Sequence, residues 1–163
     1  MDPVSIIIGI FFLALFIVPF IIMSRKGKKS EKQLLQTLAG IAEQHKCKLS
    51  QHEISGDFGI GLDEKKNFVF FCKNTTGQET RQAIDLAGIQ LCRLIKSSRT
   101  VNSKEGKHEV IERLELGLIP TAKDRPEVRL EFFNAETGRQ LNGELQSVEN
   151  WSTRINARVK IKK

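Results

Sequence analysis

The sequence contains no tyrosine, a single tryptophan and only three cysteines among its 163 residues. Cys47, Cys72 and Cys92 are odd in number, form no CxxC pair and have no histidine at metal-ligand spacing. They therefore predict neither a disulfide framework nor a zinc site, and buried thiols in a reducing compartment are expected instead. Without tyrosine, stacking on nucleic-acid bases would depend on phenylalanines that the core needs, so nucleic acid is not expected as a partner.

A recognisable catalytic constellation is also missing. The three histidines are scattered in polar surroundings, where surface positions are expected: His45, His52 and His108. Several carboxylates alternate with apolar residues and are expected to face solvent: Glu112, Glu115 and Glu131. No nucleophile, base and orienting group can be combined from these residues. The sequence therefore predicts a protein that is not an enzyme and has no cofactor or metal.

A cluster of glycines invites comparison with a phosphate-binding loop. Gly56, Gly59 and Gly61 are followed by neither a Lys-Ser/Thr pair nor a helix pattern, which such a loop requires. They lie within an alternating strand pattern, so bends or bulges of a strand are the preferred interpretation.

Charge is absent from residues 4–23, where 17 of 20 residues are apolar, all except Ser5, Gly9 and Pro19. Twenty helical residues rise about 30 Å, the thickness of the hydrocarbon core of a bilayer. A cleaved signal peptide would begin with basic residues and have a shorter apolar run, whereas Met-Asp-Pro precedes this one. Residues 1–23 are therefore predicted to be an uncleaved transmembrane anchor.

Four basic residues follow the apolar run directly, and none precedes it: Arg25, Lys26, Lys28 and Lys29. By the positive-inside rule, the N-terminus lies outside and residues 24–163 lie in the cytoplasm. This predicts a single-pass protein of the inner or plasma membrane. The same four residues either only set the topology or also contact anionic lipid headgroups, and the sequence leaves both interpretations open.

An amphipathic helix is predicted over residues 31–46, after a possible cap at Ser30. Its apolar residues recur at spacings of three and four: Leu34, Leu35, Leu38, Ile41 and Ala42. The apolar stripe could pack on the following domain or lie in the membrane interface. The mixed charge of the polar face favours packing. Residues 24–48 thus form a basic juxtamembrane stretch and a helix.

From residue 49 onward the pattern changes to that of a β-rich domain, predicted over residues 49–163. Strands are expected at 54–62, 68–72, 109–119 and 127–133, with a polar loop at 97–108. Residues 82–95 fit either a helix or a strand, and a strand with a bulge at Ala87-Gly88 is preferred.

A C-terminal amphipathic helix is predicted over residues 142–161. Its apolar residues step by three or four: Leu141, Leu145, Val148, Ile155 and Val159. Trp151 is either a plug of the core or an exposed anchor for a partner, and its apolar neighbours favour the plug. Arg154, Arg158 and Lys160 give the helix end a basic character. These residues either contact a partner or only complement the helix dipole.

Antiparallel strands closed by one C-terminal helix resemble the pleckstrin-homology-like fold. The phrase "GIGLDEKKNFVFF" (59–71) is similar to an opening of small bacterial domains of this type, and "AIDLAGI" (83–89) to the phrase that follows it. The resemblance covers about residues 49–161. It implies an α+β protein with an antiparallel sheet or partly open barrel, a terminal helix and a binding function, behind a membrane anchor. Lipid-binding members carry basic residues near the first turn, whereas Asp63 and Glu64 here offset Lys65 and Lys66, so no ligand residues are transferred.

Taken together, the sequence predicts a membrane-anchored protein that presents a small cytoplasmic binding or scaffold domain. A protein partner at the cytoplasmic face is expected, contacted through an exposed sheet edge or the basic end of the last helix. The alternatives are a domain that senses anionic lipid at the membrane surface and, less favoured, an enzyme of unrecognised type.

Overall fold

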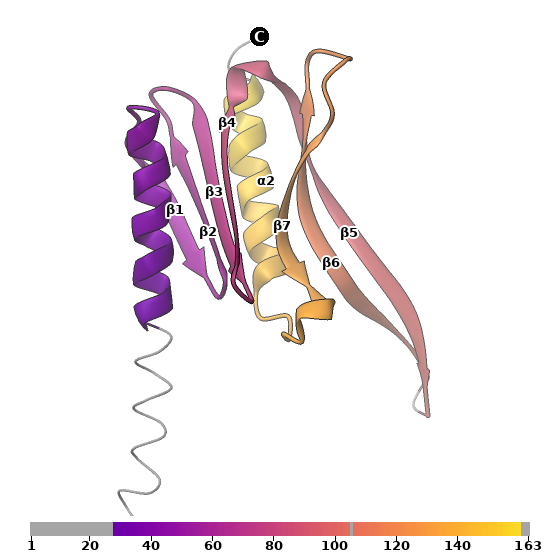
Figure 1. The fold of residues 1–163 in the computed structure, drawn as a ribbon. Coiled ribbons are helices and arrows are strands. Elements are labelled where there is room, and N and C mark those ends of the chain that lie inside the picture. The colour runs from indigo at the N-terminus through magenta and orange to yellow at the C-terminus, as the bar shows by residue number, and fades with distance from the viewer. Residues whose placement is uncertain (1–27, 105, 161–163) are drawn as a thin grey trace, which may run out of the picture.

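The computed structural model describes residues 28–104 and 106–160, and it is an α+β structure. Two antiparallel sheets and two helices make up this part of the chain (Figure 1). The first helix is described over residues 28–44 and is called the N-terminal helix below. The second is α2 (Glu144–Lys160). The expected α+β class and the terminal helix are confirmed.

The sheets follow the order of the chain. The first sheet has four strands in sequence order: β1 (Gln51–Ser55), β2 (Phe58–Asp63), β3 (Phe68–Thr75) and β4 (Gln78–Asp85). The second has three: β5 (Ile89–Ser103), β6 (Gly106–Pro120) and β7 (Val128–Asn134). Two short 3₁₀ helices complete the fold, η1 (Leu86–Gly88) and η2 (Ala135–Thr137). Among the described strands no ladder joins the two sheets, so there is no closed barrel.

The single strand expected over residues 54–62 is two strands. The chain turns at Gly56, which has a φ of +58°, and Asp57. Ile54 lies in β1 and packs beside the N-terminal helix, whereas Phe58 lies in β2 and belongs to the core on the other side of the sheet. The alternation of apolar residues hides the turn, because Ile54 and Phe58 are an even number of residues apart.

Residues 82–95 are extended on both sides of a break. The preferred strand is confirmed at each end, and the break is η1, which carries the chain from the first sheet to the second. The side chain of Asp85 accepts a hydrogen bond from the backbone N–H of Ala87 at 2.8 Å and so begins this turn. The expected bulge is therefore the hinge between the sheets.

The prediction of a polar loop at 97–108 is wrong. β5 and β6 continue through this segment as a two-stranded ribbon that extends beyond the body of the domain (Figure 1). β7 pairs with β6 only from Arg113 to Leu118, so residues 96–112, called the arm below, have no third strand. Side chains on both faces of the arm are mostly exposed, so no apolar alternation marks it as a strand.

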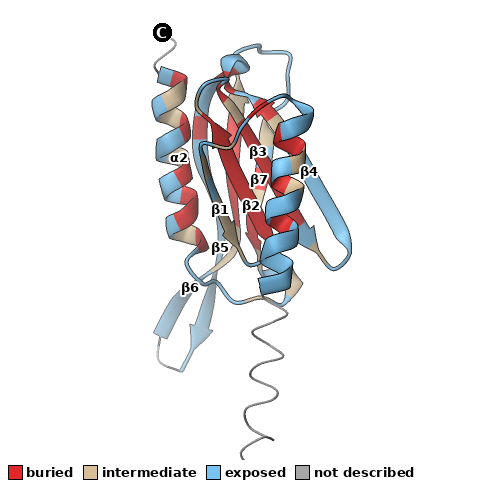
Figure 2. Cartoon of the chain, turned by 90° about the vertical axis from the view of Figure 1, so that its left-hand side faces the viewer, coloured by how far each residue is buried: buried red, intermediate tan, exposed pale blue. Residues whose placement is uncertain are grey.

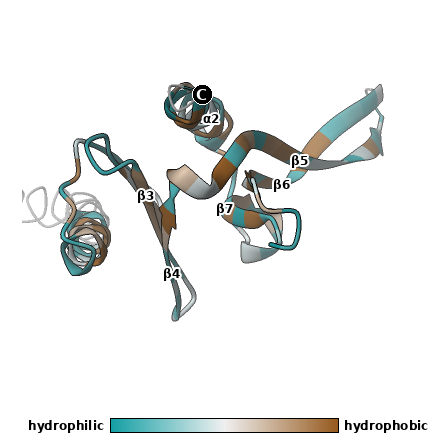
Figure 3. Ribbon diagram, turned by 90° about the horizontal axis from the view of Figure 1, so that it is seen from above, coloured by the Kyte–Doolittle hydropathy of each residue, from teal (hydrophilic) through white to brown (hydrophobic). Residues whose placement is uncertain are grey.

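The main core lies between the two sheets and α2. Viewed from above, α2 lies against the junction where the first sheet passes into the second (Figure 3). Val148, Trp151 and Ile155 of α2 are fully buried there. The indole Nε1 of Trp151 donates a hydrogen bond to Oε2 of Glu53 in β1 at 2.7 Å. The prediction that Trp151 plugs the core is confirmed.

A second core lies on the opposite face of the first sheet, under the N-terminal helix. The buried stripe of this helix faces the sheet (Figure 2), and it consists of Leu34, Leu38, Ile41 and Ala42. Glycines of β2 make room for it. A Cβ atom at Gly61 would lie 3.2 Å from Cδ2 of Leu38 and 2.7 Å from Cδ2 of Leu49. The helix therefore packs on the domain, as preferred, and Gly59 and Gly61 are close-approach positions within a strand.

The predicted transmembrane segment, residues 4–23, lies outside the described residues. Within 28–104 and 106–160, no helix combines the length and apolar character needed to cross a membrane.

Candidate functional site

The four strand edges of the two sheets differ in how they are protected. A free edge presents unpaired N–H and C=O groups, and proteins usually cover, shorten or interrupt it. β1 is five residues long. The β6–β7 ladder is interrupted by a register shift at Leu114/Glu115, and Pro126 stands before β7. At Cys92 the edge of β5 is covered by a side chain of α2, Asn156.

The edge of β4 has none of these protections. β4 pairs with β3 over eight residues without a register shift, from Phe68↔Asp85 to Thr75↔Gln78. No strand in the described part of the chain pairs with its other side. β4 contains neither proline nor glycine, and its first four residues are exposed: Gln78, Glu79, Thr80 and Arg81. β4 is therefore the longest uninterrupted free edge of the first sheet.

The register shows which backbone groups of β4 point outward. The β3–β4 hairpin turns through Thr76 and Gly77, whose φ angles are 46° and 85°, as in a two-residue type I′ turn. In such a turn the two residues that close the hairpin, here Thr75 and Gln78, form a hydrogen-bonded pair, so every second pair along the ladder is not hydrogen-bonded. The N–H and C=O groups of Glu79, Arg81, Ala83 and Asp85 then face away from β3. An incoming strand could pair with these groups.

A groove lies where the free edge of β4 ends. It has a volume of about 350 Å³ and lies between β4, η1 and the segment that leads into β7. Its walls are largely apolar, with Asp85 and Arg125 as the charged members: Ala83, Ile84, Asp85, Gly88, Ile89, Pro120, Arg125, Pro126 and Val128. This site combines free backbone groups with an apolar recess for side chains.

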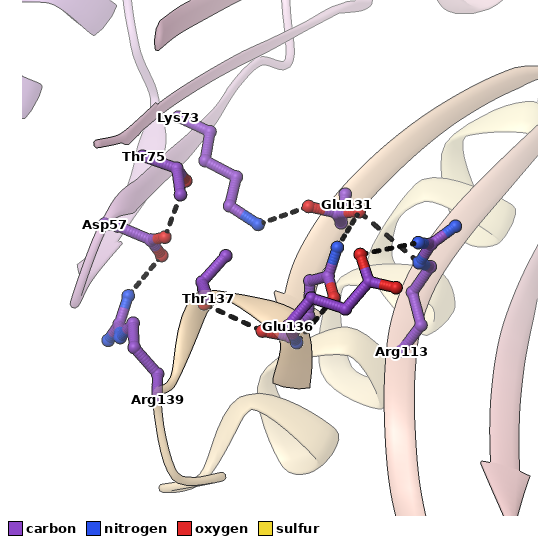
Figure 4. A network of polar contacts seen from close by, with 9 residues as sticks. Asp57, Lys73, Thr75, Arg113, Glu131, Glu136, Thr137 and Arg139 are labelled. Carbon is purple, nitrogen blue, oxygen red and sulfur yellow. Dashed lines mark hydrogen bonds and ion pairs between the residues drawn. The ribbon is translucent and has the colours of Figure 1, made fainter. Parts of the chain in front are cut away.

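A charged network spans the sheets near the other ends of β4 and β7 (Figure 4). Nζ of Lys73 in β3 lies 2.8 Å from Oε1 of Glu131 in β7, and the Lys73 side chain is only 7% exposed. Glu131 also accepts a hydrogen bond from Nδ2 of Asn134 at 3.3 Å and lies 3.6 Å from Nε of Arg113. These contacts join β3 to the β6–β7 pair, which no backbone ladder does.

Arg139 extends the network toward α2. Its guanidinium pairs with Asp57 in the β1–β2 turn and lies 3.9 Å from Oε1 of the buried Glu144. Asp57 in turn accepts a hydrogen bond from Oγ1 of Thr75 at 3.0 Å. Together these contacts connect the first sheet to the second sheet and to the start of α2.

The basic residues predicted on α2 have different surroundings. Arg158 is half-buried: its Nε donates to Oδ1 of Asn67 at 3.3 Å, and its Nη2 donates to the carbonyl oxygen of Glu64. Arg154 is exposed, and its guanidinium carbon lies 5.1 Å from the centroid of the Trp151 ring. Lys160 is exposed at the helix end. Arg158 therefore ties α2 to the β2–β3 turn, and the three residues do not form one cluster of free cations.

Of the predicted headgroup contacts, Arg25 and Lys26 lie outside the described residues. Lys28 and Lys29 are exposed on the N-terminal helix. They lie at the end of the domain that also holds the β3–β4 turn and the tip of the arm, whereas α2 ends at the opposite end (Figure 1). The two sets of predicted basic residues are thus on opposite ends of the domain.

The side chains of the β2–β3 turn are engaged in internal contacts. Asp63 accepts hydrogen bonds from the backbone N–H groups of Lys48, Lys65 and Lys66 at 2.8–3.0 Å. Nζ of Lys66 donates to the carbonyl oxygen of Lys46 at 2.5 Å. Burial alone would raise the pKa of Asp63, but these backbone hydrogen bonds lower it below its ordinary value of 3.8.

The three cysteines are buried and form no disulfide, as expected. Burial raises the pKa of the Cys72 and Cys92 thiols to about 11. Burial, followed by the nearby Asp63 carboxylate, also raises the pKa of Cys47. Within the described residues, histidine, cysteine and carboxylate side chains form no group that could hold a metal ion.

The expectation that Glu115 faces solvent is wrong. Glu115 is buried, with Oε2 lying 3.6 Å from Nη1 of Arg129, on a face of the second sheet that carries alternating acids and bases. The sequence also gave no indication of the groove, of Asn156 or of the Lys73–Glu131 pair. Each depends on residues that are distant in sequence. The alternation of charged and apolar residues in "EVIERLELG" (109–117) and "EVRLEFF" (127–133) indicates a charged face of the second sheet, but not the partners of its side chains.

No protein-family model, curated protein or solved structure matches this chain.

Proposed function

We propose that the protein is a membrane-anchored binding module that captures an extended segment of a protein partner by strand addition to β4. The observation that carries the proposal is the unprotected edge of β4. The backbone N–H and C=O groups of Glu79, Arg81, Ala83 and Asp85 face outward there, beside an apolar groove. Backbone pairing supplies affinity in this mode of recognition, and alternate side chains of the peptide enter pockets that supply specificity. The groove lined by Ile84, Ile89 and Val128 is suited to one apolar side chain of the partner.

Tethering to the membrane adds to such binding. A transmembrane segment at 4–23, with residues 24–163 in the cytoplasm, raises the effective concentration of the domain toward other proteins of the same membrane. The groove lies at the end of the domain away from residue 28 (Figure 1), so a membrane beside residue 28 leaves it open. We extend the proposal to a pleckstrin-homology-like domain, which is supported by antiparallel strands followed by a single packing helix.

The basic end of α2 is a secondary part of the proposal. Arg154 and Lys160 are exposed on α2, and this helix ends at the same end of the domain as β4 (Figure 1). An acidic stretch of the partner next to the added strand would complement them. Arg158 is better assigned to the fold, because its guanidinium is bonded to Asn67 and Glu64.

The test compares two substitutions at one position in the full-length chain, made in its own cells. Arg81→Pro removes the outward N–H without removing a β3–β4 hydrogen bond, and edge strands tolerate proline at such positions. Arg81→Ala removes the same side chain but keeps the N–H. A photo-reactive residue at Asp85 would report capture, and the same residue at the exposed His52 of β1 is the control position.

We expect a discrete cross-linked protein from position 85 and none from position 52. Its yield should persist in Arg81→Ala and fall about tenfold in Arg81→Pro, the equivalent of about 1.4 kcal/mol. Equal yields from the two Arg81 variants, or the same adduct from position 52, would show that β4 is not the binding edge. A cytoplasmic reporter fused after Lys163 tests the topology separately, since it is active only if the C-terminus is inside.

A further inference from the structure

The arm has an unusual exposure for a two-stranded ribbon. Isolated pairs of strands are marginally stable in water, because neither face is covered. Here every residue from Lys96 to Ser103 is exposed, as are Gly106 to Val110 on the facing strand. Val101 is 38% exposed and Val110 is 40% exposed, which places two large apolar side chains in solvent on the least supported part of the fold.

The register sorts the side chains of the arm into two faces. Arg99 is opposite Val110 and Val101 is opposite His108, so these four residues share one face. The other face carries Thr100, Asn102, Lys107 and Glu109. Near the body, ion pairs brace the ribbon: Lys96–Glu109 at 3.1 Å and Arg99–Glu112 at 3.2 Å. The two valines thus share a face with His108 and with Arg99, whose charge is paired with Glu112, and Lys104 is exposed at the tip.

The position of the arm is the second observation. Its tip points in the same direction as the residue 28 end of the N-terminal helix (Figures 1 and 2). In the sequence, residue 28 follows the apolar run 4–23 by five residues, which span at most about 18 Å. If that run crosses the bilayer, the end of the domain with the arm tip lies next to the membrane surface.

We propose that the arm is a second membrane contact, which places Val101 and Val110 in the interface of an anionic phospholipid bilayer with Lys104 and Lys107 among the headgroups. This inference rests on the proposed membrane anchor. Lys107 lies on the face opposite the valines, and a lysine near such a surface extends its ammonium toward the headgroups. Residues 99–110 carry three basic residues against two acidic ones, Glu105 and Glu109. The apolar face therefore contributes the burial, and the lysines contribute the preference for anionic lipid.

The test depends on a cysteine introduced at the surface. Because the three native cysteines are buried, the introduced thiol is the one that reacts with the label. The full-length Val101→Cys variant is labelled with an environment-sensitive fluorophore and reconstituted into vesicles. One set contains only phosphatidylcholine, and the other contains phosphatidylcholine with phosphatidylglycerol. Asp124→Cys, in the exposed loop at the opposite end of the domain, is the matched control.

In phosphatidylglycerol vesicles we expect a blue-shifted fluorophore at position 101 and at least threefold weaker quenching by aqueous iodide than at position 124. Lys104→Glu combined with Lys107→Glu should abolish that difference. Equal quenching at both positions, in protein that floats with the vesicles, would overturn the arm proposal and leave the anchor intact. Protein that fails to float would overturn both. A shift that follows the protein-to-lipid ratio and not lipid charge would indicate a second copy of the chain, and would also overturn the proposal.

Discussion

The side-chain amide of Asn156 binds both backbone groups of Cys92, as a neighbouring strand would. The N–H of Cys92 donates to Oδ1 of Asn156 at 2.9 Å, and Nδ2 of Asn156 donates to the carbonyl oxygen of Cys92 at 2.6 Å. One residue of α2 thereby covers the edge of β5 where the second sheet meets the core. The contrast with the uncovered β4 is the basis of the proposed binding mode.

Replacing Asn156 by alanine should therefore have two effects. It leaves the backbone groups of Cys92 without partners, which we expect to lower the free energy of unfolding by about 1–3 kcal/mol. It also uncovers the β5 edge, so self-association should increase. Urea unfolding and analytical ultracentrifugation measure the two effects. Asn150→Ala, at an exposed position of the same helix, is the control, and an equal loss in both variants would contradict the role of Asn156.

The Lys73–Glu131 pair predicts an asymmetry between its two partners. Glu131→Gln leaves the ammonium of Lys73, 7% exposed, without its counter-charge, and should lower the free energy of unfolding by about 1–3 kcal/mol. Lys73→Met removes the buried charge itself, while Glu131 keeps Asn134 and Arg113 as partners. We expect Lys73→Met to be the milder change in urea unfolding. If both variants lower the free energy of unfolding equally, or Lys73→Met lowers it more, the ammonium of Lys73 does not depend on Glu131 for its counter-charge.

Asp63 predicts a specific dependence of stability on pH. Because its pKa is lower in the folded chain than its ordinary value of 3.8, its contribution is complete above that value and is lost as the pH falls through the folded pKa. The variant Asp63→Asn should be less stable than the wild type at pH 7, and the difference should narrow below about pH 4. Unfolding curves at pH 7 and at pH 3 measure this. A difference that stays constant between these values would assign the loss to packing and not to the carboxylate.

Charge reversal should separate Arg158 from Arg154. Arg158→Glu removes the contacts with Asn67 and Glu64 and should lower stability by about 1–3 kcal/mol. Arg154→Glu loses only the contact with the Trp151 ring, worth about 0.5–1 kcal/mol at an exposed site. Thermal unfolding of the single variants measures both. A variant changed at both Arg154 and Arg158 would therefore lose stability as well as charge. Arg154→Glu combined with Lys160→Glu is the better test of partner capture.

The buried thiols predict slow alkylation of the native chain. With pKa values of about 11, Cys72 and Cys92 are thiols and not thiolates at neutral pH, and only the thiolate is the nucleophile. Iodoacetamide at pH 8 should modify them in the unfolded chain within minutes and at least tenfold more slowly in the folded chain. Mass spectrometry of the digested protein measures each site. Rapid modification of Cys92 in the native chain would mean that α2 does not stay packed on β5.

The sequence predicted those elements whose burial on one face leaves a periodic pattern. The N-terminal helix, β6, β7 and α2 each bury regularly spaced apolar residues, and Trp151 lies where its neighbours indicated. β3 is instead a continuous apolar run that is buried on both faces. The arm left no such pattern, because both of its faces are exposed over most of its length. The turn at Gly56 was hidden because the alternation of Ile54 and Phe58 continues across it.

The candidate site could not be read from the sequence for a different reason. An edge becomes free only when the pairing of all strands is known, and β4 is free because η1 diverts the next strand into another sheet. Likewise, Lys73 and Glu131 are 58 residues apart, and Asn156 and Cys92 are 64 residues apart. No local pattern relates residues at such separations.

The glycines of β2 have a mechanical consequence. Because Gly59 and Gly61 carry no side chain, Leu38 of the N-terminal helix lies directly on the strand, and Leu34 and Ile41 extend the contact along the helix. We therefore expect the helix to move together with the first sheet. A tilt imposed at residue 28 would then also move the free edge of β4.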